Sequence, residues 1–361
     1  MTDLLNPSAG LEPEGTPGAD DASKRSGLLR SVTTTALAVL GGFAIGGLLL
    51  AIAGAPPLEA YADLFRGAFG SRNAIERVLV EAAPLLIIAL GLTIAYRAKV
   101  WNIGAQGQFD AGATAAAALA LALPGVAGWA LIPMSLVVAA IAGAAIGALI
   151  GFLRARYDAN VVITSLMLNY VAFFFLAWVV RRPLRDPAGF LPQSARVPDD
   201  ARLPLLFDSR VNVGLVIALV LAVAVWWLFR RTATGFSLDL IGQSSDVAEA
   251  VGRPVRRLIV GAAAASAAFA GLAGGIQLLG SEFRLAQTIS SGVGFTAIVV
   301  ALLGRLRPAG VVLSAIFIAG LEVGGDAMQR TQGIPGAAVR VIQAIFVIFL
   351  LVAHRVSERG R

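Results

Sequence analysis

The chain contains no cysteine, and among its 361 residues histidine occurs once and lysine twice. Without cysteine there is no disulfide, no thiolate metal ligand and no cysteine nucleophile. The one histidine, His354, excludes a cluster of histidine ligands. We therefore predict no catalytic residue, no metal site and no cofactor.

The scarcity of lysine excludes one further class of protein. A Walker A loop needs Gly-Lys followed by Ser or Thr, because the lysine and nearby backbone amides hold the phosphates of ATP. Lys24 precedes Arg25 and Lys99 precedes Val100, so neither lysine belongs to such a loop. If ATP drives this protein, another polypeptide hydrolyses it.

Charged residues make up only 14% of the chain, against 57% hydrophobic residues. The net charge of +7 would suit a nucleic-acid partner. However, the arginines lie mostly in short segments between apolar stretches, which is typical of integral membrane proteins. We therefore expect a lipid bilayer as the surroundings and no nucleic-acid partner.

Long apolar segments fill the chain from about Ser31 to Ala353. A helix rises about 1.5 Å per residue, so roughly 20 apolar residues cross a hydrocarbon core about 30 Å thick. The segments predict an all-α fold, a polytopic transmembrane helix bundle of about ten spans. The predicted spans lie near residues 31–54, 78–96, 104–123, 130–153, 161–180, 211–229, 258–279, 288–304, 309–323 and 339–353.

Residues 1–27 are rich in Gly, Pro, Asp and Glu and predict a disordered cytoplasmic tail, whereas residues 28–361 predict one transmembrane domain. Lys and Arg favour the cytoplasmic side in short loops, and the assignment that places most of them there puts both termini in the cytoplasm. The exception is a predicted outer loop at about 181–210, with six arginines and five prolines. The prolines predict extended or turned backbone, which serves either as a connector or as a landing surface for an external partner.

A polar segment interrupted by glycines, residues 100–113, opens one of these spans. It carries Trp101, Asn102, Gln106 and Gln108, and polar groups at membrane depth are costly unless they face protein or a wet cavity. Irregular helices of this kind line transport routes, so we expect these residues to line or gate a pathway. The alternative is an interfacial belt at Trp101, with the amides capping a helix.

Two further segments carry polar residues into apolar surroundings. The span that begins at Asn160 contains Asn169, for which helix packing and pathway lining both remain open. Residues 280–294 lead into the stretch Gly-Val-Gly-Phe at 292–295, which loosely resembles the Gly-Gln-Phe-Asp stretch that begins at Gly107. Two related halves would fit a transporter with internal repeats.

The longest predicted inner loop, at about 230–257, has the signals of a short capped helix. Asp246 or Ser245 can cap it, and Glu249 follows Asp246 by three residues, as in a capping box. Gly252 and Pro254 then end it. Such a helix suits docking to a soluble partner, and the alternative is an ordinary connector.

Four stretches resemble the permease subunits of bacterial ABC importers of the branched-chain amino acid and ribose type, and within that group the permeases of nucleoside (simple sugar) uptake systems. They are Trp101–Gln108 (WNIGAQGQ), Asn160–Tyr170 (NVVITSLMLNY), the inner loop from Gly235 through Gly242 to Gly252, and Gly292–Ile298 (GVGFTAI). The chain departs from the family pattern at Gln106, where the family often has Glu, and at Asp239, where it often has Arg.

The resemblance implies a division of labour. An external solute-binding lipoprotein captures the cargo, and this chain and a second permease, identical or homologous, form the pathway. An ABC ATPase subunit binds the inner loop and drives transport. The chain would then be a multi-pass protein of the bacterial inner (cell) membrane.

We assign residues to two roles. The predicted substrate-pathway residues are Trp101, Asn102, Gln106, Gln108 and Asn169. The predicted ATPase-coupling residues are Gly235, Gly242, Asp246, Glu249 and Gly252.

Two other classes of membrane protein fit less well. An ion-coupled secondary transporter of a small polar solute needs buried carboxylates, and only Asp110 and Glu322 lie near a span interior. A membrane-embedded enzyme would need a nucleophile or paired carboxylates, which the spans lack. The sequence therefore predicts a permease subunit of an ATP-driven importer that translocates nucleosides or related sugars and is not itself an enzyme.

Overall fold

The computed structural model describes residues 40–52 and 54–359, so the predicted tail at 1–27 and the first part of the first predicted span lie outside the described residues. It divides into two compact units. The larger is Glu59–Ile334, and the smaller comprises the described parts of Met1–Leu58 and Pro335–Arg361.

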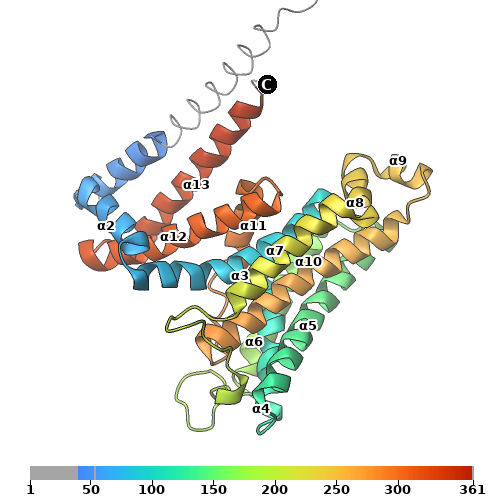
Figure 1. Ribbon diagram of the computed structural model, residues 1–361, viewed down its shortest axis with the longest axis horizontal. Helices are drawn as coiled ribbons and strands as arrows, with labels where there is room; N and C mark the ends of the chain where they lie inside the picture. The colour runs from blue at the N-terminus through green and yellow to red at the C-terminus, as the bar shows by residue number, and fades with distance from the viewer. Residues whose placement is uncertain (1–39, 53, 360–361) are drawn as a thin grey trace, which may run out of the picture. The chain divides into compact units, whose positions relative to one another are not determined.

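Within residues 40–52 and 54–359 the regular structure is helical, with isolated β-bridges and no β-strand (Figure 1). The helices are Leu40–Ile52, α2 (Pro57–Phe69), α3 (Arg72–Arg97), α4 (Ala105–Ala122), α5 (Gly128–Tyr157), α6 (Val161–Val179), α7 (Gly214–Arg231), α8 (Ala233–Gln243), α9 (Ser245–Ala250), α10 (Val255–Gln277), α11 (Val293–Leu303), α12 (Pro308–Gln332) and α13 (Gly336–Arg359). A π-turn, Leu278–Glu282, extends α10, and a 3-10 turn, Asp199–Ala201, lies in the predicted outer loop. In the smaller unit, Leu40–Ile52 packs against α13, where Gly41 meets the Phe349 ring.

Helix α3 lies at the centre of the larger unit. Its residues from Ala82 to Tyr96 are buried without a break. A helix that is apolar on every side is buried from water, either by other elements or by lipid. Helices α7, α10, α11 and α12 pack around α3 and enclose it in this way.

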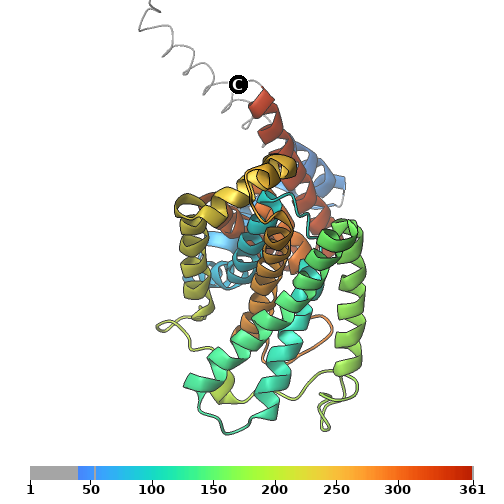
Figure 2. The ribbon, with the colours of Figure 1, turned by 90° about the vertical axis from the view of Figure 1, so that its right-hand side faces the viewer.

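Glycines bring α5 and α10 into close contact. A Cβ atom at Gly143 or Gly147 of α5 would collide with the backbone of α10, and one at Gly271 of α10 would collide with α5. Small residues let helices approach closely in a bilayer, where lipid supplies no hydrophobic drive for association. These glycines therefore let α5 and α10 pack closely, and Figures 1 and 2 show α4, α5 and α10 side by side.

The number of spans differs from the prediction. Six helices of the described chain are long and apolar enough to cross a membrane: α3, α5, α6, α7, α10 with its π-turn, and α12. The bent pair Leu40–Ile52 and α2 would make a seventh. Helix α4 begins with polar residues, and α11 has 11 residues, which cover only about 16 Å. A polytopic helical bundle is thus supported, while ten spans and cytoplasmic termini stay predictions.

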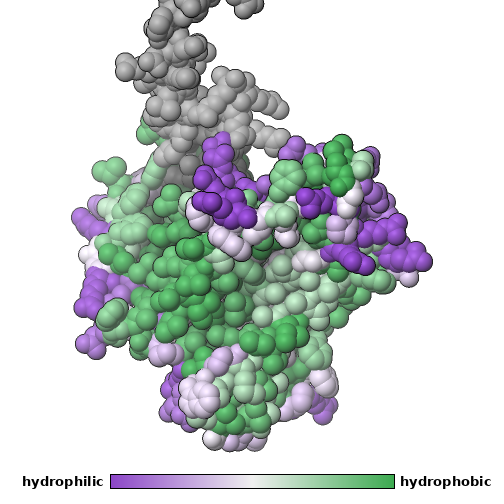
Figure 3. All heavy atoms as spheres, turned by 45° about the vertical axis from the view of Figure 1, so that its right-hand side comes forward, coloured by the Kyte–Doolittle hydropathy of each residue, from purple (hydrophilic) through white to green (hydrophobic). Residues whose placement is uncertain are grey.

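The outward faces of α6 and α7 are apolar. Phe174 and Trp178 of α6, and Val223 and Trp227 of α7, are more than half exposed. Figure 3 shows that apolar side chains cover a broad area of the surface, with hydrophilic residues gathered at its borders. Exposed apolar area of this extent suits contact with lipid.

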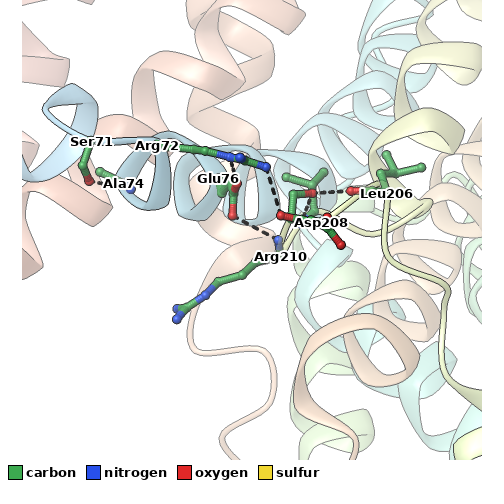
Figure 4. A network of polar contacts seen from close by, with 9 residues as sticks. Ser71, Arg72, Ala74, Glu76, Leu206, Asp208 and Arg210 are labelled. Atoms are coloured by element: carbon green, nitrogen blue, oxygen red, sulfur yellow. Dashed lines mark hydrogen bonds and ion pairs between the residues drawn. The ribbon is translucent and has the colours of Figure 1, made fainter.

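The predicted outer loop is tied to the start of α3 (Figure 4). Arg72 pairs with Glu76 (Nε to Oε1, 2.8 Å), and its Nη2 donates to the backbone carbonyl of Asp208 (2.9 Å). The second carboxylate oxygen of Glu76 accepts from the backbone N–H of Arg210 (3.1 Å). These bonds hold the last residues of the loop against the start of α3.

The first half of the same loop is clamped to the segment after α10. The Arg284 guanidinium pairs with Asp186 (Nη1 to Oδ2, 2.7 Å), and this hydrogen bond holds the pKa of the Asp186 carboxyl below its ordinary value. The backbone N–H of Ser194 donates to the Leu285 carbonyl (2.9 Å), and the Leu285 N–H donates back to the Ser194 hydroxyl (2.9 Å). As the prolines predicted, the loop is extended and turned, and it contains only the 3-10 turn as helix.

Candidate functional site

A pair of buried amides fixes the start of α4. Asn102 lies in the short connection between α3 and α4, and Gln108 lies one turn into α4; both are completely buried. Asn102 Nδ2 donates to Gln108 Oε1 (2.9 Å), and Gln108 Nε2 donates to Asn102 Oδ1 (3.1 Å). Asn102 Oδ1 also accepts from the Gly104 N–H (2.9 Å). Because these groups satisfy one another, they form a rigid frame.

Helix α6 completes this frame from the other side. Asn169 Oδ1 accepts from the Gly107 N–H (2.8 Å), one of the first amides of α4, which have no partner inside their own helix. Asn169 Nδ2 donates to the Ile103 carbonyl (3.0 Å), and the Ser165 hydroxyl accepts from the Ile103 N–H (3.1 Å). Of the two roles left open for Asn169, these contacts favour helix packing.

Gln106 joins the starts of two helices. Its side chain is half-buried, and Oε1 accepts from the N–H of Gly294 at the beginning of α11 (2.9 Å). A Cβ atom at Gly294 would collide with the backbone of Gln106, so glycine is required for this approach. The two segments whose sequences resemble each other, around Gly107 and Gly292, therefore meet in the structure.

Trp101 is the exposed member of the predicted pathway set. Its side chain is 43% exposed, and its ring lies 4.8 Å from the Tyr96 ring, measured between centroids. The Tyr96 hydroxyl donates to the Asn102 carbonyl (2.9 Å), which connects the aromatic pair to the amide frame. Trp101 and Gln106 are thus the partly exposed members of the predicted set, whereas Asn102, Gln108 and Asn169 are buried.

Three neighbours of this cluster were missing from the predicted set. Ser165 and Gly294 make the contacts given above, and the Ser266 hydroxyl of α10 lies 3.4 Å from Asn102 Nδ2. The sequence signal for the Ser266 contact was a lone serine in an alanine-rich run.

Asp110 is 1% exposed, and neither carboxylate oxygen has a hydrogen-bond partner within the described residues, although the Ser290 hydroxyl lies nearby.

The predicted coupling loop forms two short helices, α8 and α9. Ser244 caps α9, since its hydroxyl accepts from the Val247 N–H (3.3 Å), so the prediction of Ser245 or Asp246 as the cap is wrong. The chain enters the helix one residue earlier, with Ser244 still extended (φ −155°). As predicted, α9 ends before Gly252, whose φ of +76° suits glycine.

The five predicted coupling residues separate into two groups. Gly235 and Gly242 are buried, and a Cβ atom at either would collide with a backbone carbonyl, of Leu228 and Arg97 respectively. They hold α8 against α7 and α3. The other three are exposed on α9 and its end: Asp246, Glu249 and Gly252.

Apolar side chains accompany these exposed acids. Phe236, Val247 and Val251 are 60%, 51% and 61% exposed. Apolar anchors beside charged groups are typical of protein–protein contact surfaces. Sequence reasoning missed these three residues, because their exposure depends on how α8 and α9 pack against the neighbouring helices.

Comparison with known proteins identifies the family. Residues 74–353 match the family described as "Branched-chain amino acid transport system / permease component". The chain belongs to this permease family. No solved structure was found that matches it.

Similar characterised proteins carry related names. The chain is 34% identical to the glucose ABC transporter permease protein TsgB13 of Haloferax volcanii, over 89% of this chain and 87% of the relative. It is 31% identical to the guanosine ABC transporter permease protein NupP of Bacillus subtilis (89% and 93%). It is 29% identical to the nucleoside ABC transporter permease protein NupB of Lactococcus lactis (90% and 91%).

The predicted resemblance is therefore confirmed, and this permease is a transport subunit of the ABC type rather than an enzyme. Its apolar helices agree with a multi-pass membrane protein. Permeases of this class work in general with an ATPase subunit and a binding protein.

Proposed function

We propose that this permease is one membrane-spanning subunit of an ATP-driven importer of nucleosides or related sugars in a bacterial inner membrane. An external binding lipoprotein delivers the cargo, and a second permease, identical or homologous, completes the pathway. The observation that carries the proposal is the match over nearly the whole chain to permeases named for guanosine, nucleosides and glucose.

The chemistry of the candidate site supports a neutral cargo. Gln106 presents an amide that both donates and accepts hydrogen bonds, and Trp101 offers an exposed aromatic face. Sugar hydroxyls pair with amides, and a nucleobase stacks on an aromatic ring. Asn102 and Gln108 keep these two residues in place through the rigid frame behind them.

The energy source lies on another chain in this proposal. The full sequence has no Walker A loop, so ATP must be hydrolysed by a separate subunit. The exposed acids and apolar side chains of α9 form the contact surface for this ATPase subunit. One cavity of about 270 Å³ beside α8 and α9 is lined by Lys99, Arg154 and Ser244, among others. Basic residues therefore gather at the same end of the protein as the proposed ATPase contact on α9. By the positive-inside rule this end is cytoplasmic.

An ion-coupled secondary transporter remains the second candidate because of one observation. Asp110 is a buried carboxyl without a hydrogen-bond partner in the described chain, and such groups carry protons in some transporters. This alternative requires transport by the chain without an ATPase.

Reconstitution into liposomes separates the two functions. The permease is prepared alone and in a complex with the ATPase, second permease and binding lipoprotein, and uptake of radiolabelled guanosine is measured with and without ATP. We expect uptake only by the complex with ATP, competition by other nucleosides, and no uptake with a hydrolysis-deficient ATPase. Uptake by the permease alone under a proton or sodium gradient would overturn the proposal.

A further inference from the structure

Arg97, at the end of α3, contacts three separate elements with one side chain. Its Nη1 pairs with Asp239 Oδ2 of α8 (3.0 Å), and its Nε donates to the Leu306 carbonyl in the turn between α11 and α12 (3.2 Å). Its guanidinium carbon lies 4.0 Å from the centre of the Phe229 ring of α7. The backbone carbonyl of Arg97 also packs against Gly242 of α8.

These contacts use properties that only arginine combines. The guanidinium is planar, donates hydrogen bonds in several directions and stacks on aromatic faces, whereas lysine acts as a point charge. The Arg97 side chain is 23% exposed and that of Asp239 40%, so the ion pair is partly shielded from water. Burial raises the pKa of Asp239, and the Arg97 charge offsets part of that rise. Asp239, a departure from the family pattern, is thus the intramolecular partner of Arg97.

The turn that Arg97 holds has a strained backbone. Arg305 and Leu306 both have positive φ angles, 58° and 52°, which side-chain-bearing residues rarely adopt. Such conformations persist only where the surroundings impose them. The hydrogen bond from Arg97 to the Leu306 carbonyl is one such constraint.

Helix α11 connects this turn to the candidate pathway. It ends at Leu303, just before the turn, and its other end carries Gly294, which donates to Gln106. A helix of 11 residues is a short rigid rod of about 16 Å. Helix α11 therefore links the turn to the contact with Gln106.

We propose that Arg97 transmits movement of α8 and α9 to α3 and, through Leu306 and α11, to the Gln106 contact. This inference rests on the proposed function, since it presumes that α8 and α9 dock an ATPase. Arg97 is a positioning residue that touches neither ATP nor cargo. It makes uptake depend on hydrolysis.

The test measures cargo molecules imported per ATP hydrolysed by the reconstituted complex. For Arg97→Gln we expect this ratio to fall about 10-fold, the size of effect that residues between coupled sites produce, while the ATPase subunit still co-purifies. Arg97→Lys keeps the charge but loses the planar guanidinium that donates in several directions, so the cargo imported per ATP should also fall. The matched control is Arg156→Gln, an exposed arginine on α5 whose ring contact is with its own neighbour Tyr157; its ratio should not change.

A double-mutant cycle tests the pair directly. If Arg97 acts through Asp239, then Asp239→Asn added to Arg97→Gln lowers the ratio by less than the product of the two single effects. If Arg97→Gln imports as much cargo per ATP as the wild type, the inference is overturned. This includes the case in which uptake and hydrolysis fall in parallel, since that result indicates a merely structural role. If Arg97→Gln fails to assemble, Arg97→Lys decides by the same criteria. Wild-type complex without ATP-dependent uptake would instead refute the proposed function.

Discussion

Replacing Asn102 by alanine should destabilise the permease by about 3 kcal/mol. The Asn102 side chain takes part in three hydrogen bonds of 2.9 to 3.1 Å with Gln108 and Gly104. Hydrogen bonds between membrane helices contribute about 0.6 kcal/mol each, which gives roughly 2 kcal/mol. The completely buried Gln108 amide then lacks its partner, and this adds about 1 kcal/mol or more.

The measurement is unfolding in mixed micelles with increasing SDS, followed by the fluorescence of the five tryptophans. Gln106→Ala is the matched control, because Gln106 is only half-buried and its side chain makes one hydrogen bond at this site, with Gly294. The free energy of unfolding of Gln106→Ala should fall by less than about 1 kcal/mol. Its uptake should nevertheless be impaired. If Asn102→Ala proves no less stable than Gln106→Ala, the buried amide pair does not support the site as argued.

Three further changes test other parts of the structure. Gly294→Val should force α11 away from α4 and abolish uptake while the protein still inserts, as measured by transport and by membrane yield. Asp246→Arg combined with Glu249→Arg should uncouple ATP hydrolysis from uptake, as measured by uptake per ATP, because both exposed acids change sign. Lowering the pH should release the outer loop: the pKa of Asp186 is depressed, so its pairing with Arg284 stabilises the fold above the ordinary aspartate pKa of about 4 and is lost as the pH falls below it. Protease cleavage within residues 181–210 would report this release.

Each of these expectations has an outcome that contradicts it. Normal uptake by Gly294→Val would mean that the contact between α4 and α11 is not part of the pathway. An unchanged uptake per ATP after the double charge reversal would place the docking surface elsewhere. Asp186→Asn should be cleaved at every pH as readily as the wild type is in acid; cleavage that still depends on pH would assign the effect to another group.

Local signals predicted much of the helical structure. The apolar run at 161–180 became α6 (Val161–Val179), and Asn160 caps it as a side chain of this type should. The run at 288–304 was less well predicted, because a turn through Ser291 and Gly292, both with positive φ, delays the start of α11 to Val293. Hydropathy alone does not register such a turn.

The candidate site shows the same limit. The sequence predicted that residues 100–113 were special, because polar residues there interrupt an apolar chain. It did not predict which of them pair, since Asn169 and Gly294 reach this segment only through the tertiary fold. Arg97 and Asp239 are 142 positions apart, and no local pattern joins them.

The enclosure of α3 has a consequence for how the protein is made. Helices α10, α11 and α12 surround α3 in the finished molecule, but the ribosome produces them long after it. Until then α3 must reside in lipid, and its long apolar sequence allows that. Helix α4 begins with polar residues and cannot reside alone in lipid in the same way. We therefore expect α4 to enter the membrane together with a neighbouring helix, as a hairpin.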